Sequence, residues 1–401
     1  MSTEMITVYG ASWCPDCKRS KTFLGEQRVP FHFIDLEESP EAAEIVENYN
    51  DGKRIIPTIV FPDGSILVEP SNEELADKLG LKRDAAMDSY DVVIVGGGPA
   101  GLTTAIYCAR ENLRTLIVER SALGGQAGVT ERLDNYPGFP DGVLGAELAD
   151  RFALQAARYG VEMLTAVGVT DLSSDMGRVH VTTSTGQILN AGAVVVSTGS
   201  TYRRTGVPGE EDLIGAGIHF CATCDGPFYK GAEEVVVIGG GNSGFEEGLF
   251  LTQFAEHVTI LEASATPRAS RLLQDKVAAH PKMTVLTETK VTGFTSNEHG
   301  KLATVEMLTA DGQAVSHSAA GAFVFIGLDP NTGWLRGKID IDDYGFIVTD
   351  RTLQTTMPGV FAAGDVRGGS TKQLAAAVGE GAAVALQIRH HLETLAAGVS
   401  A

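Results

Sequence analysis

Two glycine-rich turns constrain the fold of this chain more than any other feature of its sequence. Each turn has the pattern Gly-x-Gly-x-x-Gly, follows a run of apolar residues and precedes a predicted helix. In such a turn the first glycine permits a tight bend, the second lets a pyrophosphate approach the backbone, and the third lets the helix pack closely on the strand. The glycines at these positions are Gly96, Gly98, Gly101, Gly239, Gly241 and Gly244.

An acidic residue follows each turn at the end of a second apolar run. Glu119 ends the run 115–118, and Glu262 ends the run 258–261. In a dinucleotide-binding fold, the acid about 20 positions after the turn accepts hydrogen bonds from a ribose hydroxyl. One such turn is weak evidence, and the alternative interpretation is two structural turns with two surface glutamates. Two complete sets predict two Rossmann-like dinucleotide-binding folds.

Four of the five cysteines form two Cys-x-x-Cys pairs, Cys14 with Cys17 and Cys221 with Cys224. Zinc is an alternative for two pairs, but zinc ribbons space their pairs much more closely, so we expect no metal site. In a reducing cytosol we interpret both pairs as catalytic dithiols, and each precedes a predicted helix whose exposed amides stabilise a thiolate. The fifth, Cys108, lies in an apolar helical run and is expected to be a small buried residue.

The composition excludes several classes of partner. The 401 residues are 43% hydrophobic and 20% charged, and 51 carboxylates against 31 Lys and Arg give a net charge of −20. This charge repels phosphate backbones and anionic lipid surfaces, so we expect no nucleic-acid partner and no membrane partner. The stretch 92–109 is low in charge, but its glycines and Pro99 indicate strand, turn and helix rather than a membrane span. No basic stretch with an apolar core begins the chain, which predicts a cytoplasmic protein.

Residues 1–81 have a pattern of their own. Apolar runs at 6–9, 31–35 and 56–61 alternate with predicted helices, which indicates a small βαβ unit followed by a hairpin. Trp13 is expected either to cover the Cys14 sulfur or to pack in the core of this domain. The polar stretch 82–89 is expected to be a linker, because an apolar strand begins abruptly after it.

From residue 90 onward the motifs resemble those of low-molecular-weight thioredoxin reductases. The resemblance rests on five segments that occur in the family's order and rough spacing, 96–101, 124–126, 221–226, 239–244 and 361–365. It implies FAD on the first dinucleotide fold, formed by 90–204 and 328–401, and a nicotinamide-binding domain inserted at 205–327. Besides the first glycine-rich turn, the FAD contacts that it implies are Glu119, Gly125, Gln126, Asn135, Gly364, Asp365 and Gln373.

Within that family, the second dinucleotide fold most resembles the flavoprotein subunit of alkyl hydroperoxide reductase, through segments 239–244, 257–262 and 326–332. The NADPH-dependent reductases carry a His-Arg-Arg cluster where this chain has Leu261-Glu262-Ala263. A carboxylate there accepts hydrogen bonds from a free ribose 2′-hydroxyl and repels a 2′-phosphate. The resemblance therefore favours NADH, with NADPH as the alternative.

The N-terminal segment resembles glutaredoxins. Cys14-Pro15-Asp16-Cys17 matches their active-site turn, and Pro57 stands where that family has a cis-proline. Residues 69–72 replace the family's glycine-aspartate contact for glutathione, which argues against glutathione use. The expected fold class is α/β: a thioredoxin-fold, glutaredoxin-like domain and two Rossmann-like domains, with the nicotinamide domain inserted in the FAD domain.

These resemblances imply a flavin-dependent disulfide reductase that is a homodimer. A hydride passes from the nicotinamide to FAD, and the electrons reach the Cys221–Cys224 disulfide, with Cys224 facing the flavin and Cys221 as the exchange thiol. Asp225 is the candidate proton donor to the leaving thiolate, and its alternative role is a helix cap. The electrons continue to Cys14 and Cys17 and then to a protein disulfide of a peroxiredoxin, a thioredoxin or another redoxin.

Two other functions are compatible with the same motifs. A dithiol oxidase of this fold would pass electrons from a substrate dithiol through Cys221 and Cys224 to FAD and oxygen. Such an oxidase needs no nicotinamide site, whereas the second glycine-rich turn and Glu262 are intact. A redox-sensing binding protein would dock a partner through its N-terminal domain without turnover.

Overall fold

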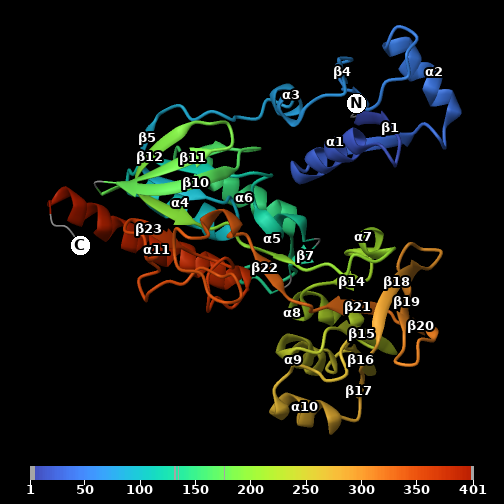
Figure 1. Cartoon of the computed structure of the whole chain (residues 1–401). Helices are drawn as coiled ribbons and strands as arrows, with labels where there is room; N and C mark the ends of the chain where they lie inside the picture. Colours follow the sequence, from blue (N-terminus) through green and yellow to red (C-terminus); the bar gives the residue numbers. More distant parts are fainter. Residues whose placement is uncertain (1–4, 131, 134, 176, 399–401) are drawn as a thin grey trace. The chain divides into compact units, whose positions relative to one another are not determined.

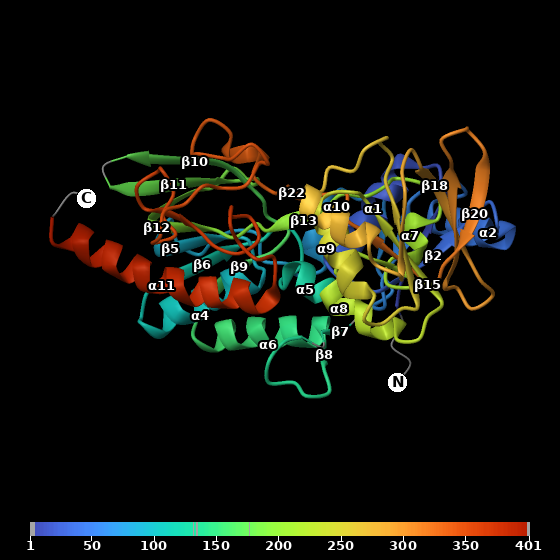
Figure 2. The same ribbon diagram turned by 90° about the horizontal axis from the view of Figure 1, so that it is seen from below.

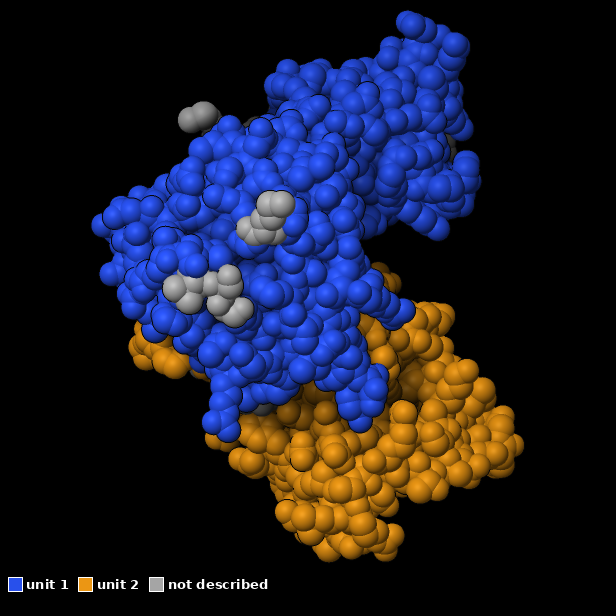
Figure 3. All heavy atoms as spheres, turned by 60° about the vertical axis from the view of Figure 1, so that its left-hand side comes forward, with its two compact units in different colours: residues 1–128, 148–199, 332–401 blue, residues 129–147, 200–331 orange. Residues whose placement is uncertain are grey.

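The computed structural model of the chain describes residues 5–130, 132–133, 135–175 and 177–398, and of Pro40, Arg132, Thr223 and Cys224 only the backbone. The chain forms two compact units, coloured differently in Figure 3. One contains residues 1–128, 148–199 and 332–401, and the other contains 129–147 and 200–331. Each unit is described by itself.

The N-terminal part of the first unit is a four-stranded sheet in the order β2-β1-β3-β4, drawn in blue in Figure 1. β1 and β2 are parallel, and the β1–β3 and β3–β4 pairs are antiparallel. Val8, Leu24, Ile59 and Leu75 are fully buried in its core. The elements are β1 (Ile6–Gly10), α1 (Pro15–Glu26), β2 (Phe31–Asp35), α2 (Pro40–Tyr49), β3 (Thr58–Val60), β4 (Ile66–Val68) and α3 (Asn72–Lys78). This is the predicted βαβ unit followed by a hairpin.

The predicted linker, 82–89, is held along the rest of the first unit by hydrogen bonds. Glu162 accepts the backbone N–H of Ala86 at 2.7 Å and the Tyr90 hydroxyl at 2.5 Å, and pairs with the Lys82 ammonium at 2.7 Å. Burial raises the pKa of Glu162, but the hydrogen bonds from Lys82, Tyr90 and Ala86 outweigh it, so the net pKa lies below its usual value. We call Glu162 and these three partners the linker clamp.

The remainder of the first unit is built on a seven-stranded sheet. β12 changes partners along its length: its first half pairs antiparallel with β11, and its second half pairs parallel with β23. β5 runs parallel to β12 on the other side. The strands are β5 (Ser89–Val95), β6 (Thr115–Val118), β9 (Glu162–Leu164), β10 (Val169–Asp175), β11 (Arg178–Thr183), β12 (Ile188–Val196) and β23 (Val360–Ala362).

Helices α4 (Pro99–Arg110) and α11 (Leu374–Ala396) pack against each other along one face of this sheet (Figure 2). Because α4 packs against both the sheet and α11, most of its circumference is buried, which explains the low charge of 92–109. Shorter elements complete this region: α5 (Gly125–Val129), β7 (Arg132–Leu133), β8 (Val143–Leu144), α6 (Gly145–Arg158) and η2 (Gly333–Leu335). Within the described part of the chain, no helix is both long enough and apolar enough to cross a membrane.

The second unit contains a parallel sheet in the order β14-β21-β15-β16-β17. A three-stranded antiparallel sheet, β18-β19-β20, packs with it, and β13 pairs with β22 where the chain enters and leaves the unit. The strands are β13 (Ser200–Tyr202), β14 (Ile218–His219), β15 (Glu234–Ile238), β16 (His257–Leu261), β17 (Met283–Leu286), β18 (Lys290–Ser296), β19 (Leu302–Leu308), β20 (Ala314–Ser318), β21 (Gly321–Val324) and β22 (Leu328–Pro330). The helices are α7 (Glu210–Leu213), α8 (Ala222–Asp225), η1 (Gly226–Tyr229), α9 (Asn242–Leu251) and α10 (Arg271–Ala278).

Candidate active site

The first glycine-rich turn joins β5 to α4, as predicted. Glu119, 8% exposed, accepts the N–H of Gly97 at 2.6 Å and the N–H of Ser121 at 2.8 Å. Gly98 is the N-cap of α4 and has no side chain to bond the first helical amides. Open space lies where a Cβ on Gly98 would be, so an anion has room to approach these amides. A pyrophosphate fits this arrangement.

Gly101 shows why the third glycine is needed. A Cβ on this residue would overlap the carbonyl oxygen of Gly96 and crowd the hydroxyl of Ser197. Only a glycine allows the first turn of α4 to approach the end of β5 this closely.

The second turn, between β15 and α9, repeats this geometry. Glu262, 4% exposed, accepts the N–H of Gly240 at 2.7 Å and the N–H of Ser264 at 2.8 Å. Burial raises the pKa of Glu262, but the hydrogen bonds from Ser264 and Gly240 and the charge of Arg268 bring it below its usual value. Gly241 is the N-cap of α9, again with open space where a Cβ would be. The side chain is therefore an ionised acceptor beside an open helix N-terminus.

Asp365 follows β23 and is largely buried. Its Oδ1 atom has no hydrogen-bond partner among the described residues, and burial raises its pKa against the opposing charge of Lys372. A buried acceptor without a partner is costly unless a ligand donates to it. A sugar or ribityl hydroxyl supplies such a donor, so Asp365 fits the FAD contact that the resemblance implies.

Sequence reasoning missed Glu380, which holds the Asp365 loop in place. Its carboxylate accepts the N–H of Gly364 at 2.7 Å and two hydrogen bonds from Arg367, the shorter at 2.6 Å. Glu380 lies on α11, and no local pattern links it to residues 364–367. Of the other predicted FAD contacts, Gln126 lies on α5 and Gln373 is the N-cap of α11. Asn135 belongs to the second unit, and its role stays a prediction.

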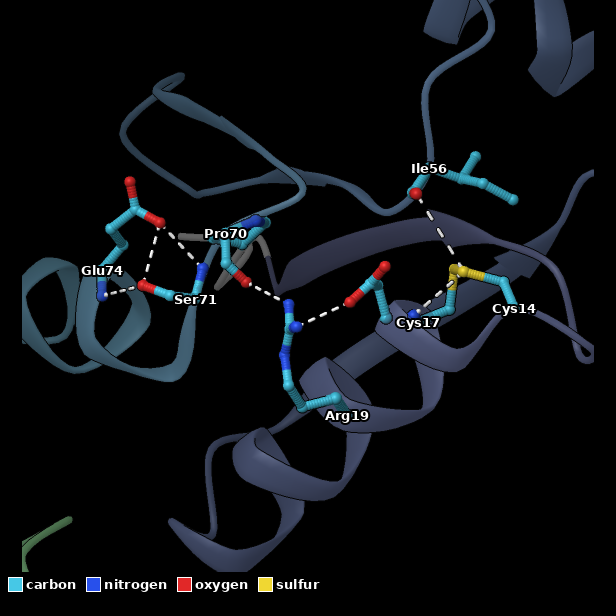
Figure 4. Close-up of polar contacts among 8 residues, drawn as sticks. Cys14, Cys17, Arg19, Ile56, Pro70, Ser71 and Glu74 are labelled. Atoms are coloured by element: carbon cyan, nitrogen blue, oxygen red, sulfur yellow. Dashed lines mark hydrogen bonds and ion pairs between the residues drawn. A yellow bond between two sulfur atoms is a disulfide. The ribbon is translucent and has the colours of Figure 1, made fainter.

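Cys14 and Cys17 form a disulfide at the start of α1 (Figure 4). Cys14 is the N-cap of this 12-residue helix, and its Sγ accepts the N–H of Cys17 at 3.1 Å. The peptide bond between Ile56 and Pro57 is cis, as the glutaredoxin resemblance implies, and the carbonyl of Ile56 lies 4.0 Å from Cys14 Sγ. Amide donation to this sulfur stabilises a thiolate at Cys14.

Trp13 does not pack in the core. Its side chain is 62% exposed, and its indole N–H donates to Glu37 at 2.9 Å. The core alternative was wrong because this hydrogen bond fixes the indole on the surface beside Cys14.

The segment that replaces the glutathione contact is closed by its own hydrogen bonds. Ser71 and Glu74 cap α3 reciprocally, and the Arg19 guanidinium bridges Asp16 and the carbonyl of Pro70, both at 2.6 Å (Figure 4). The Ser71 hydroxyl accepts the N–H of Glu74 at the start of α3, so this amide is not available to an anion. The Glu74 carboxylate beside it repels anions. Whether glutathione binds here stays a prediction from the sequence.

The second cysteine pair lies at α8, a helix of only one turn. Cys221 directly precedes it, and its carbonyl accepts the N–H of Asp225 at 3.0 Å. The side chain of Cys224 lies outside the described residues. The helix-cap role for Asp225 was wrong: its side chain makes no cap hydrogen bond and instead lies 3.5 Å from His219 Nδ1. A one-turn helix contributes little dipole, so the amide argument applies more strongly to Cys14.

Cys108 is 1% exposed on α4, as predicted, and burial raises the pKa of its thiol to about 12. Among the side chains that the structure describes, no three His, Cys, Asp or Glu residues gather as a metal site.

Comparison with known proteins places these sites in a family. Residues 90–381 match the model of the pyridine nucleotide-disulphide oxidoreductases, and residues 6–66 match glutaredoxin. The chain is 39% identical over 321 residues to thioredoxin reductase of Streptomyces clavuligerus, covering 77% of this chain and 96% of that protein. It is 34% identical over 384 residues to a subunit of alkyl hydroperoxide reductase from Staphylococcus epidermidis, covering 93% of this chain and 73% of that protein. The crystal structure of thioredoxin reductase from Streptococcus pyogenes superposes with a TM-score of 0.72 at 36% identity, over 77% of this chain and 99% of that one.

Two dinucleotide folds combined with a redox dithiol define a flavin-dependent disulfide oxidoreductase. The chain belongs to the pyridine nucleotide-disulphide oxidoreductase family and carries a glutaredoxin domain at its N-terminus. It is an NAD(P)H-dependent FAD enzyme of the thioredoxin reductase type. The match to alkyl hydroperoxide reductase runs through both parts, which confirms the resemblance inferred from the residues.

Proposed function

We propose that this enzyme passes two electrons from NADH, through FAD and the Cys221/Cys224 pair, to Cys14 and Cys17 and then to a protein disulfide. When bound, FAD accepts a hydride from the nicotinamide and supplies the electron pair that cleaves the Cys221–Cys224 bond. Residues 1–81 form the redoxin domain, 90–204 with 328–401 bind FAD, and 205–327 bind the nicotinamide. The observation that carries the proposal is the presence, on one chain, of an oxidised redoxin dithiol and two complete dinucleotide turns.

The preference for NADH rests on an internal comparison of the two turns. Glu119 and Glu262 accept equivalent pairs of backbone N–H groups, one pair from Gly97 and Ser121 and the other from Gly240 and Ser264. In the FAD contact that the resemblance implies, Glu119 would hold an adenosine ribose that carries no 2′-phosphate. The same geometry around Glu262 suits the same ribose, which in a nicotinamide coenzyme is that of NADH.

The chain's own residues transfer one proton and exchange a disulfide between the two cysteine pairs. Cleavage of the Cys221–Cys224 bond leaves a thiolate at Cys221, and Asp225 supplies its proton. The Cys221 thiol returns this proton to the Asp225 carboxylate as its sulfur attacks the Cys14–Cys17 disulfide, and Cys224 resolves the mixed disulfide, which leaves Cys14 and Cys17 reduced. Cys14 attacks the acceptor disulfide, and Cys17 releases the reduced acceptor.

The acceptor is a protein disulfide of a peroxiredoxin, a thioredoxin or another redoxin. Relatives named thioredoxin reductase and alkyl hydroperoxide reductase support this class. The reducing chemistry suits the cytoplasm, and the family resemblance supports a homodimer.

One experiment tests the proposed function directly. The FAD-loaded Cys17→Ser variant, reduced with NADH, should trap a disulfide between Cys14 and its acceptor, whereas Cys14→Ser with intact Cys17 serves as the matched control. In parallel, wild type should reduce a small aromatic disulfide with NADH. A dithiol oxidase would instead consume oxygen with a substrate dithiol and ignore NADH, and a redox sensor would show neither activity.

A further inference from the structure

Three polar side chains cluster on the segments that flank the Cys221/Cys224 pair in the sequence. His219 places its Nδ1 atom 3.5 Å from Oδ2 of Asp225 and its Nε2 atom 2.6 Å from the hydroxyl of Tyr229. The side chains of His219 and Asp225 are only 10% and 18% exposed. A buried or nearly buried polar chain of this kind fixes the rotamer of each member. We call these three residues the His219 cluster.

The fold builds this cluster from two segments on either side of the cysteines. His219 ends β14, two residues before Cys221, and Tyr229 ends η1, which follows Asp225. The rings of His219 and Tyr229 both pack on Phe323 of β21, with centroids 5.3 and 5.4 Å away. A Cβ on Gly321 would overlap the Tyr229 ring, so this ring reaches His219 only because residue 321 is a glycine.

The chemistry of the three groups favours one direction for these contacts. Burial raises the pKa of Tyr229, so its hydroxyl stays protonated and can donate to Nε2 of His219. A neutral imidazole whose Nε2 accepts must carry its proton on Nδ1. That N–H faces the Asp225 carboxyl group. The chain therefore runs from Tyr229 through His219 to Asp225.

We propose that His219, backed by Tyr229, is a positioning residue that orients Asp225 and stabilises the carboxylate formed when Asp225 protonates the leaving thiolate. This inference rests on the proposed function. In the step concerned, NADH, through FAD, supplies two electrons that break the Cys221–Cys224 bond. Asp225 gives one proton to the Cys221 sulfur and becomes a carboxylate. The Nδ1–H of His219 stabilises that new charge by a charge-assisted hydrogen bond.

The test separates flavin reduction from disulfide cleavage. The full-length, FAD-loaded protein is mixed anaerobically with NADH, the loss of visible flavin absorbance is followed, and acid-quenched samples are titrated for new thiols. His219→Leu removes the donor to Asp225, whereas His219→Asn places an amide N–H near the position of Nδ1. The matched control is His257→Leu, because His257 is another hydrogen-bonded histidine of the same sheet, with Nε2 2.9 Å from Thr284 Oγ1.

We expect flavin reduction at the wild-type rate in all these variants. Thiol formation should fall about 10- to 100-fold in His219→Leu, less than the roughly 100- to 10,000-fold that general acid catalysis contributes, because Asp225 itself is still present. His219→Asn and His257→Leu should remain within about 2- to 3-fold of wild type, since one retains the donor and the other lies elsewhere. Tyr229→Phe should slow thiol formation by about 3- to 10-fold, because it removes only the hydrogen bond that sets the tautomer.

Wild-type thiol formation in His219→Leu would overturn the inference, and so would a defect in His219→Asn as large as in His219→Leu. If His219→Leu fails to fold or to retain FAD, Tyr229→Phe decides, because an unchanged rate in it contradicts the role of the His219 cluster. Failure of the proposed function gives a different result, since wild type itself would then form no thiols after its flavin is reduced.

Discussion

Replacing Glu262 by glutamine isolates the charge that we propose discriminates between NADH and NADPH. Glutamine has the same size, and its carbonyl oxygen still accepts the N–H of Gly240, which Glu262 accepts at 2.7 Å. With a 2′-phosphate about 5 Å from the carboxylate and an effective dielectric constant of about 20, each pair of unit charges repels by about 3 kcal/mol. Removing that repulsion should raise kcat/KM for NADPH by about 100-fold.

The same substitution weakens NADH. A neutral amide replaces a charged acceptor for the ribose hydroxyls, which costs about 1 kcal/mol or about 5-fold in kcat/KM for NADH. The assay is steady-state disulfide reduction with each coenzyme, and the wild type should prefer NADH. Glu119→Gln is the matched control, since it alters the equivalent contact on the FAD side and should leave the coenzyme ratio unchanged. A wild type with higher kcat/KM for NADPH, or an unchanged ratio in Glu262→Gln, would refute the assignment of Glu262.

Three further predictions follow from the other sites. Wild type should hold about one FAD per chain and Gly101→Val none, because any Cβ at residue 101 overlaps the backbone of the turn. Flavin absorbance measures the bound FAD, and a colourless wild type after reconstitution would contradict this prediction. Cys14→Ser should keep NADH reduction of FAD while nearly abolishing electron delivery to the protein acceptor, and Cys224→Ser should block both redoxin reduction and electron delivery. Undiminished acceptor reduction by Cys14→Ser would show that the redoxin domain is not in the path. The linker clamp should open in acid: because the folded pKa of Glu162 is depressed, its stabilisation is complete above about pH 4.3 and is lost as pH falls through the folded pKa. Hydrogen exchange of residues 82–89 measures this, and Glu162→Gln should exchange faster at neutral pH, whereas equal exchange would show that the clamp does not hold the linker.

The glycine-rich turns could be predicted because their requirements are local. Gly101 must let α4 approach β5, and Glu262 must follow a strand beside the turn. Each requirement fixes a residue type within about 25 residues of sequence, so the pattern can be recognised without the structure. The cysteine pairs are also visible in the local sequence, whereas the cis peptide before Pro57 is expected only from the resemblance to glutaredoxins.

The contacts that hold these motifs in place could not be predicted. Glu162 contacts the linker more than 70 residues earlier, and Glu380 reaches back from α11 to the loop at Gly364. The His219 cluster depends on the absence of a side chain at Gly321, 92 residues beyond Tyr229. Such contacts arise when strands and helices distant in sequence pack together, and a single sequence contains no periodicity that reports them.

The helices that follow the two cysteine pairs differ in a way that supports the electron flow that we propose toward the redoxin domain. Cys14 caps a 12-residue helix, and its sulfur accepts an amide N–H, whereas Cys221 precedes a helix of one turn. A helix N-terminus stabilises a nearby anion by about 0.3–1 kcal/mol. Stabilising the reduced thiolate raises the potential of its disulfide, by about 20 mV for 1 kcal/mol in a two-electron couple. On the proposed path, the longer helix favours the Cys14–Cys17 disulfide as the electron acceptor. Cys14 also directly follows the exposed Trp13, so the sulfur that the helix stabilises adjoins a residue at the surface, where the acceptor that we propose could reach it.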